Sequence, residues 1–203
     1  KHRSHELVPV DECLLEAPHG PQHVALGVDF EVADGGFWQV HPGAPDTLVE
    51  AVLAVLDPQP GESALDLYAG VGLFARFLHD RVGETGRVVA VEGDRRASRL
   101  SLTNAPGIEA TAGDVGEVLA TSYDQAFDLV VLDPPREGAK RTVVEQVVAR
   151  TPRAVAYVAC DPAALARDVA IFAEHGYALV SLRAFDLFPM THHVECVALL
   201  EPR

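Results

Sequence analysis

Short apolar runs alternate with stretches of helical spacing from residue 64 to residue 174. This alternation is typical of a mostly parallel sheet with helices on both faces. The predicted strands are 64–68, 87–91, 108–112, 127–132 and 153–159, followed in turn by predicted helices at 72–81, 94–104, 115–121, 139–150 and 162–174. Two more strands, 177–186 and 193–200, lack a helix between them and should pair antiparallel at one edge. The expected fold is α/β: a Rossmann-like, doubly wound, seven-stranded sheet with an antiparallel edge hairpin.

A glycine-rich turn ends the first strand, in the segment ALDLYAGVGL at residues 64–73. Gly70 and Gly72 permit a tight turn and let the backbone approach a ligand at the N-terminus of the next helix. Glu92 ends the following strand, where a carboxylate can accept hydrogen bonds from ribose hydroxyls. The glycines fit the loose dinucleotide motif, so a nicotinamide or flavin enzyme is one interpretation. The spacing D-x-x-x-G-x-G from Asp66 equally resembles motif I of S-adenosylmethionine-dependent methyltransferases.

Composition narrows the possible functions. The 203 residues suffice for one α/β domain, and a formal charge of −14 argues against a general polyanion-binding surface. No apolar run approaches the ~20 residues that span a bilayer, so we expect no membrane contact and a cytoplasmic location. Cys13, Cys160 and Cys196 are too few and too scattered for a disulfide framework. No metal site is expected either, because His192 and His193 are neighbours that would point to opposite faces of a strand.

Three strand ends on the expected ligand side carry reactive groups. Asp133 precedes two prolines, which fix the backbone and present the carboxylate with little freedom. Cys160 stands just before a helix that starts near Pro162, and a helix N-terminus stabilises a thiolate. Cys160 is therefore a candidate nucleophile, with a small buried hydrophobe as the alternative. Glu195 is either a rim residue or a carboxylate whose dry surroundings make it a base. Dehydrogenases have no general need for these groups, which weakens the nicotinamide interpretation.

Six segments in order resemble the uracil-5 methyltransferases that act on transfer and ribosomal RNA. They are FWQVHP, DLYAGVGLF, VEGD, DPPREG, YVACDPAALARD and FDLFPMTHHVECVALL. The resemblance covers about residues 36–200 and implies a class I methyltransferase fold. It implies S-adenosyl-L-methionine as cofactor, S-adenosyl-L-homocysteine as product, and tRNA or rRNA as substrate.

The resemblance also implies residue roles. A thiolate that adds to carbon 6 of uracil makes carbon 5 nucleophilic, and Cys160 matches that nucleophile. Glu195 matches the general base that removes the proton from carbon 5, and Asp133 would contact the cofactor or the pyrimidine edge. The implied cofactor-binding residues are Gln39, Tyr68, Gly70, Gly72, Glu92 for the ribose, Asp114 for the adenine edge, and Asp133.

Three positions depart from the family pattern. Leu73, His41 and Asp161 stand where the family often has Asn. An added carboxylate at Asp161 should raise the pKa of the Cys160 thiol, against the effect of the helix N-terminus. These departures affect substrate contacts and rate more than fold.

We expect residues 41–203 to form the catalytic domain and residues 1–40 to be an extended or strand connector from a missing N-terminal region. Family members commonly carry an N-terminal RNA-binding barrel, and some hold an iron-sulfur cluster. Cys13 resembles the last cluster ligand, but the other ligands would lie before Lys1, so no cluster is expected in this chain alone. A missing barrel would also explain how so acidic a domain serves RNA.

Two alternatives remain open from the residues. One is direct methyl transfer to another substrate without a covalent step, which should survive Cys160→Ala. The other is a non-catalytic, cofactor-binding module associated with RNA, which would bind S-adenosylmethionine without turnover.

Overall fold

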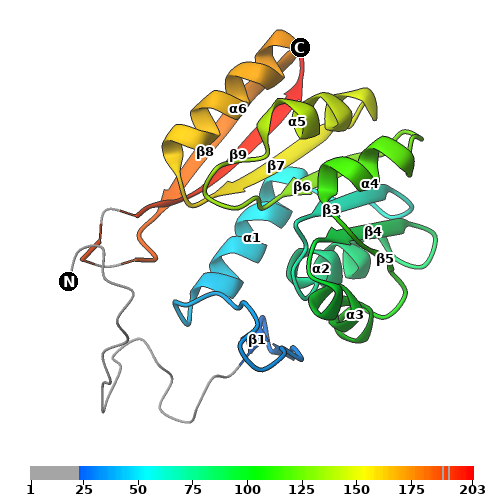
Figure 1. The fold of residues 1–203 in the computed structure, drawn as a ribbon, viewed down its shortest axis with the longest axis vertical. Helices are drawn as coiled ribbons and strands as arrows, with labels where there is room; N and C mark the ends of the chain where they lie inside the picture. Colours follow the sequence, from blue (N-terminus) through cyan, green and yellow to red (C-terminus); the bar gives the residue numbers. More distant parts are fainter. Residues whose placement is uncertain (1–22, 189, 192) are drawn as a thin grey trace.

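The computed structural model describes residues 23–188, 190–191 and 193–203 of the chain (Figure 1). Its centre is a seven-stranded sheet in the order β5-β4-β3-β6-β7-β9-β8. The strands are β3 (Ser63–Leu67), β4 (Arg87–Glu92), β5 (Glu109–Ala112), β6 (Leu129–Leu132), β7 (Ala154–Ala159), β8 (Tyr177–Phe185) and β9 (Glu195–Pro202). The first five pair in parallel, whereas β9 is antiparallel to both β7 and β8. The predicted fold class is confirmed.

The helices connect successive strands, as the alternation predicts. They are α1 (Ala44–Leu56), α2 (Leu73–Val82), α3 (Arg95–Asn104), α4 (Val115–Thr121), α5 (Lys140–Ala149) and α6 (Pro162–Glu174). The chain winds outward from β3 to β5 and then returns to β6 on the other side of β3. In doubly wound sheets such a reversal opens a crevice at the carboxyl ends of the strands, where ligands bind.

Two apolar clusters lie on the two faces of the sheet. The first contains residues of α1 and α2, and the second contains residues of α4, α5 and α6. Alternate residues of one strand enter different clusters: Ala64 joins the first, and Leu65 and Leu67 join the second. Every residue of β6 and β7 is buried, as expected for central parallel strands covered on both faces.

The N-terminal connector is described only from residue 23. From there the chain forms a short hairpin of β1 (Val24–Ala25) and β2 (Val28–Asp29). The hairpin is fixed to the domain, since Leu26 N–H donates to Asp46 Oδ1 at 2.7 Å. Phe30 then packs against Trp38 and Phe77, with ring centroids 5.2 and 6.2 Å away.

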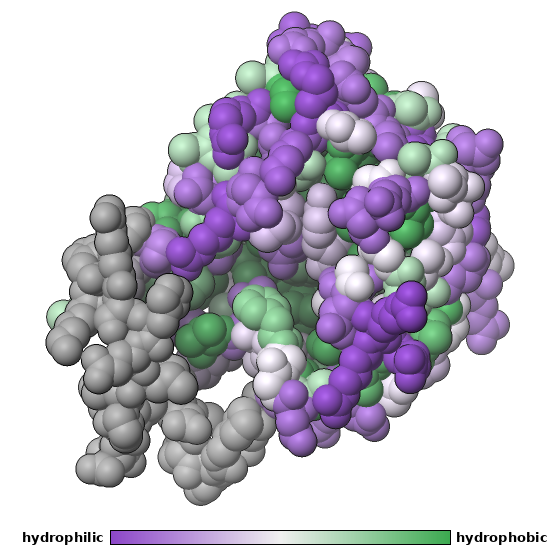
Figure 2. Space-filling view, viewed as in Figure 1, coloured by the Kyte–Doolittle hydropathy of each residue, from purple (hydrophilic) through white to green (hydrophobic). Residues whose placement is uncertain are grey.

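The outer surface is mainly hydrophilic on the face seen in Figure 2, with apolar residues interspersed. Within the described residues, no helix combines the length and the apolar character that crossing a membrane requires.

Candidate active site

The glycine turn after β3 uses its two glycines for different purposes. Gly70 has φ +54°, and a Cβ added there would meet nothing within 4 Å. Gly72 has φ +89°, and a Cβ there would lie 2.9 Å from Ser101 Cβ. Gly72 therefore lets α3 pack closely on the turn, whereas Gly70 borders open space. Tyr68 also adopts a positive φ, of 64°, which is rare for a residue with a side chain.

Glu92, at the end of β4, holds this turn in place. Its Oε2 accepts the Gly70 N–H at 2.7 Å, and its Oε1 accepts the Asp94 N–H at 2.8 Å. The carboxylate is half-buried and fixed beside the open space in front of Gly70. A carboxylate oxygen has more than one acceptor position, so Glu92 retains capacity for a ligand hydroxyl.

Asp66 is a buried acid that sequence reasoning did not select as a site residue. It is fully buried in β3, and its Oδ2 accepts the Ala75 N–H of α2 at 2.8 Å. Its Oδ1 is buried and has no hydrogen-bond partner among the described residues. Burial raises the pKa of Asp66 to about 7, and the nearby Glu92 adds to the rise. The available signal was the first position of the D-x-x-x-G-x-G spacing.

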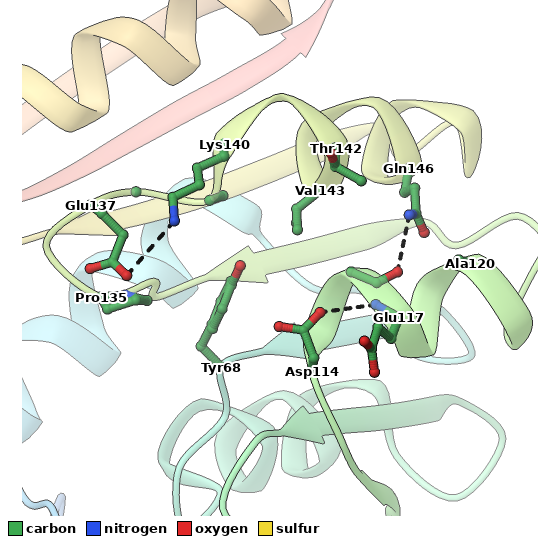
Figure 3. Close-up of a pocket in the computed structure, with 13 residues that line it drawn as sticks. Tyr68, Asp114, Glu117, Ala120, Pro135, Glu137, Lys140, Thr142, Val143 and Gln146 are labelled. Atoms are coloured by element: carbon green, nitrogen blue, oxygen red, sulfur yellow. Dashed lines mark hydrogen bonds and ion pairs between the residues drawn. The ribbon is translucent and has the colours of Figure 1, made fainter.

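A cavity of about 520 Å³ lies next to Tyr68, between α4 and α5 (Figure 3). Tyr68 rises from the end of β3 between Pro135 and Asp114. Asp114 is the N-cap of α4, where its Oδ1 accepts the Glu117 N–H at 3.0 Å. Burial raises the pKa of Tyr68 to about 12, and the charge of Asp114 contributes.

The structure thus brings two of the predicted cofactor residues into one cavity. The cavity is lined by Tyr68, Asp114, Gly116, Glu117, Ala120, Pro135, Glu137, Gly138, Ala139, Lys140, Thr142, Val143 and Gln146. Gly70, Gly72, Glu92 and Asp133 are not among its lining residues. Gln39 is half-buried in the segment between β2 and α1 and does not line the cavity either.

The antiparallel placement of β9 brings the other candidates to one edge of the sheet. Cys160 follows the last residue of β7, and Glu195 is the first residue of β9. Ala159 pairs with Cys196, so Cys160 and Glu195 lie side by side. Asp133 follows β6, the neighbour of β7, and its N–H donates to Leu67 O at 3.3 Å.

Charge coupling among these groups agrees with their proximity. Burial raises the pKa of Asp133 well above its usual range, and Glu195 is the largest charge acting on it. Burial likewise raises the pKa of Glu195, which is only 6% exposed. Of the two interpretations, a rim residue or a carboxylate in dry surroundings, this burial favours the second.

The net pKa shift at Cys160 is opposite in direction to the one expected from the helix N-terminus. The pKa of the thiol is raised, first by burial and then by Glu195 and Asp133. The amides at the start of α6 are already occupied, because Asp161 Oδ1 accepts the N–H groups of Ala163 and Ala164 at 2.9 and 2.8 Å. Carboxylates do raise the pKa of Cys160, as expected, but they are those of Glu195 and Asp133 on neighbouring strands rather than that of Asp161.

Arg136 is a second residue that sequence reasoning did not select. This exposed guanidinium lowers the pKa of both Cys160 and Glu195, against the effect of burial. It is the cationic side chain that acts on the nucleophile candidate and the base candidate together. Its signal in the sequence was its place in the DPPREG segment.

No group of three or more potential metal-ligating side chains comes together within the described residues. His193 packs edge-on against Phe188, with ring centroids 5.9 Å apart. Cys13 and His192, which entered the arguments about a cluster and a metal, lie outside the described residues.

Sheet order, glycine turn and the acid that holds the turn fit an S-adenosylmethionine-dependent methyltransferase domain. The family model "Methyltransferase small domain" matches residues 42–157, and the model "tRNA (Uracil-5-)-methyltransferase" matches residues 115–203. The first model matches more than half of the chain, which therefore belongs to the methyltransferases, and over residues 115–203 the chain is similar to the RNA uracil-5 methyltransferases.

Two curated proteins and one solved structure are similar to most of this chain. An RNA methyltransferase of Streptomyces avermitilis, itself uncharacterised, is 54% identical over 88% of this chain and 42% of its own length. The 23S rRNA (uracil(1939)-C(5))-methyltransferase RlmD of Aeromonas hydrophila is 37% identical over 92% of this chain and 43% of its own. The structure of Pyrococcus abyssi tRNA (uracil-54, C5)-methyltransferase with S-adenosyl-L-homocysteine matches at TM-score 0.73 and 29% identity, over 86% of this chain and 42% of that one. The chain therefore spans less than half the length of these relatives.

Proposed function

We propose that this chain is the catalytic domain of an RNA (uracil-5-)-methyltransferase that transfers a methyl group from S-adenosyl-L-methionine to carbon 5 of a uridine in tRNA or rRNA. The observation that carries the proposal is the convergence of Cys160, Glu195 and Asp133 at one edge of the sheet. The family matches support it, since the tRNA (Uracil-5-)-methyltransferase model includes all three residues.

The residues beside the turn fit the cofactor. Open space lies in front of Gly70, and the buried Asp66 Oδ1 lacks a partner that a ligand donor could supply. Glu92 is fixed beside that space and suits a ribose diol. The acids around the turn also favour a ligand that carries positive charge. When bound, S-adenosyl-L-methionine supplies an activated methyl group.

Four further residues complete the proposed cofactor site. Asp114 would accept a hydrogen bond from the adenine edge, and Tyr68 would form the wall of the same cavity. Asp133 and Gln39 would border the reacting end, Asp133 because it ends the strand between the turn and Cys160. The cofactor product would be S-adenosyl-L-homocysteine.

The covalent step begins at Cys160. The thiol gives its proton to solvent, Sγ bonds to carbon 6 of uracil, and the electron pair of the 5,6 double bond moves toward carbon 5 and the 4-oxygen. That pair forms the new bond from carbon 5 to the methyl group, whose bond to the sulfonium sulfur would break to leave S-adenosyl-L-homocysteine. Glu195 then takes the proton from carbon 5, the double bond re-forms, and sulfur leaves carbon 6. Glu195 must be ionised to act, and Arg136 favours that state.

A mechanism-based trap tests the proposal. The chain is incubated with S-adenosyl-L-methionine and RNA that contains 5-fluorouridine, and its intact mass is measured. Because fluorine cannot leave as a proton, the expected result is a methylated protein–RNA adduct. Cys160→Ala should abolish the adduct, whereas Cys196→Ala, the matched change at a buried cysteine, should keep it.

The opposite results separate the alternatives. Methylated RNA without an adduct, persisting in Cys160→Ala, would indicate direct transfer. Cofactor binding without adduct or product, even with the full-length protein, would indicate a non-catalytic module associated with RNA.

We further propose that residues 41–203 are the catalytic domain and that residues 1–40 connect it to another region. An RNA-binding barrel in that region would supply the RNA affinity that a domain of net charge −14 lacks. An iron-sulfur cluster in this chain alone is not part of the proposal. RNA binding that is strong and insensitive to salt in the isolated chain would contradict this division of roles.

A further inference from the structure

A buried pair of polar side chains, Tyr157 and Asp168, has no role in the proposed chemistry. Tyr157 lies on β7 and is fully buried, and Asp168 lies on α6 and is 3% exposed. The Tyr157 hydroxyl donates to Asp168 Oδ2 at 2.5 Å, and burial raises the pKa of Tyr157. Burying two polar groups is costly unless they gain strong partners, so this pair requires a reason.

The remaining partners of the pair lie at the end of the DPPREG segment. Ala139 N–H is shared between Asp168 Oδ2 at 2.7 Å and the Tyr157 hydroxyl at 3.0 Å. Lys140 N–H also points to Asp168 Oδ2, at 3.3 Å. These amides belong to the N-terminus of α5, whose own N-cap residue provides no side-chain cap. Asp168 therefore caps α5 from a neighbouring helix.

At Gly138 the DPPREG segment passes very close to the Asp168 carboxylate. A Cβ at Gly138 would lie 2.6 Å from Asp168 Oδ2, and its φ is +79°. Gly138 N–H in turn donates to Pro135 O at 2.8 Å, which closes the turn that carries Arg136. Two residues of the motifs in the sequence, the glycine of DPPREG and the last aspartate of YVACDPAALARD, thus meet at one contact.

The same network belongs to the elements on either side of the candidate nucleophile. Tyr157 lies on β7, which ends just before Cys160, and Asp168 lies on the helix that begins just after Cys160. The segment that contains Arg136 is held at its start by β6 and at its end by the capped N-terminus of α5. We propose that Asp168 and Tyr157 are positioning residues that fix residues 133–139 relative to Cys160, and so hold the turn that carries Arg136 next to the end of β7.

This proposal rests on Cys160 as the nucleophile, but its test needs neither RNA nor turnover. The rate of iodoacetamide alkylation at Cys160 is measured against pH by peptide mass mapping in the full chain. Asp168→Asn should move the midpoint of this profile upward by about half a pH unit, because Arg136 no longer stands near the thiol. Tyr157→Phe, which removes one hydroxyl only, should move it in the same direction by less.

A double-mutant cycle distinguishes positioning from loss of stability. In an Arg136→Met background, Asp168→Asn should leave the alkylation midpoint unchanged, because the charge it positions is absent. Arg150→Lys is the matched control: it disturbs a buried guanidinium near the other end of α5 and should lower stability without moving the midpoint.

Two results would overturn the proposal. One is an equal upward movement of the midpoint with and without Arg136, and the other is an unchanged midpoint in both Asp168→Asn and Tyr157→Phe. If the midpoint moves as expected while the 5-fluorouridine adduct never forms, the positioning role stands and the proposed function fails.

Discussion

Asp66→Asn should remove a loss of stability with rising pH that the burial of Asp66 causes in this domain. Asp66 has its pKa raised from 3.8 to about 7 by burial. As pH rises between these values, the unfolded chain ionises Asp66 freely while the folded chain keeps it neutral. Stability is therefore lost with rising pH, by at most about 4 kcal/mol at about 1.4 kcal/mol per pH unit. Below pH 4 both states are protonated and the penalty is absent.

Asparagine at this position mimics the neutral acid. Its oxygen can still accept the Ala75 N–H. Free energies of unfolding from urea titrations, followed by far-ultraviolet circular dichroism at intervals from pH 5 to pH 8, would measure the difference from the parent chain. The free energy of unfolding of Asp66→Asn, relative to that of the parent chain, should rise steadily up to about pH 7 and stay constant above it.

The control is Asp128→Asn. Hydrogen bonds from Ser63 lower the pKa of Asp128, so it is ionised in both states throughout this range. Its difference from the parent should stay constant from pH 5 to pH 8, since its contribution changes only at lower pH. Parallel curves for Asp66→Asn and the parent would refute the reasoning, because Asp66 would then ionise alike in the folded and unfolded chains.

Three other changes have directions that the structure determines. Gly72→Ala should lower the free energy of unfolding by about 2–4 kcal/mol, because of left-handed strain and the clash with Ser101. Gly70→Ala should lower it by about 1 kcal/mol and mainly weaken cofactor binding, which calorimetry would measure. Arg150→Met should cost about 3 kcal/mol or more in urea titration, because its guanidinium donates to several main-chain carbonyls. Glu195→Gln should accumulate a covalent methylated adduct on ordinary uridine RNA, detectable by denaturing electrophoresis; release at the parent rate would exclude Glu195 as the base.

The fold could be predicted closely because its signals are local. Apolar runs and helical spacing located every strand and helix of the seven-stranded sheet within about two residues. The differences arise where long-range bonds decide. Strand β6 begins at Leu129 rather than 127, because Phe127 and Asp128 donate their N–H groups to Arg150 and Ser63 outside the ladder with β7.

The sequence allowed the candidate site residues to be grouped, but it did not allow their pKa shifts to be predicted. Strand ends of a parallel sheet meet at one edge, so Asp133, Cys160 and Glu195 could be grouped from the sequence. The direction of the pKa change at Cys160 could not be taken from its neighbour in the chain, because Asp161 occupies the helix amides and Glu195 arrives from a distant strand. The roles assigned to these residues, the domain division and the cytoplasmic location stay predictions.

Asp66 and Asp168 illustrate a further limit. Each is a single acid within an otherwise regular strand or helix, so periodicity gives it no special status. Their importance comes from burial and from partners on other elements: Ala75 for Asp66, and Tyr157 and Ala139 for Asp168.

The insertion of β9 between β7 and β8 makes the last strand in the chain an inner strand of the sheet. The parallel strands, the glycine turn and Cys160 precede β9 in the chain, whereas Glu195 enters only when β9 is seated. In the sheet β8 pairs only with β9, so it cannot join before that moment. Glu195 therefore reaches its place beside Cys160 only after the last strand of the chain has paired with β7.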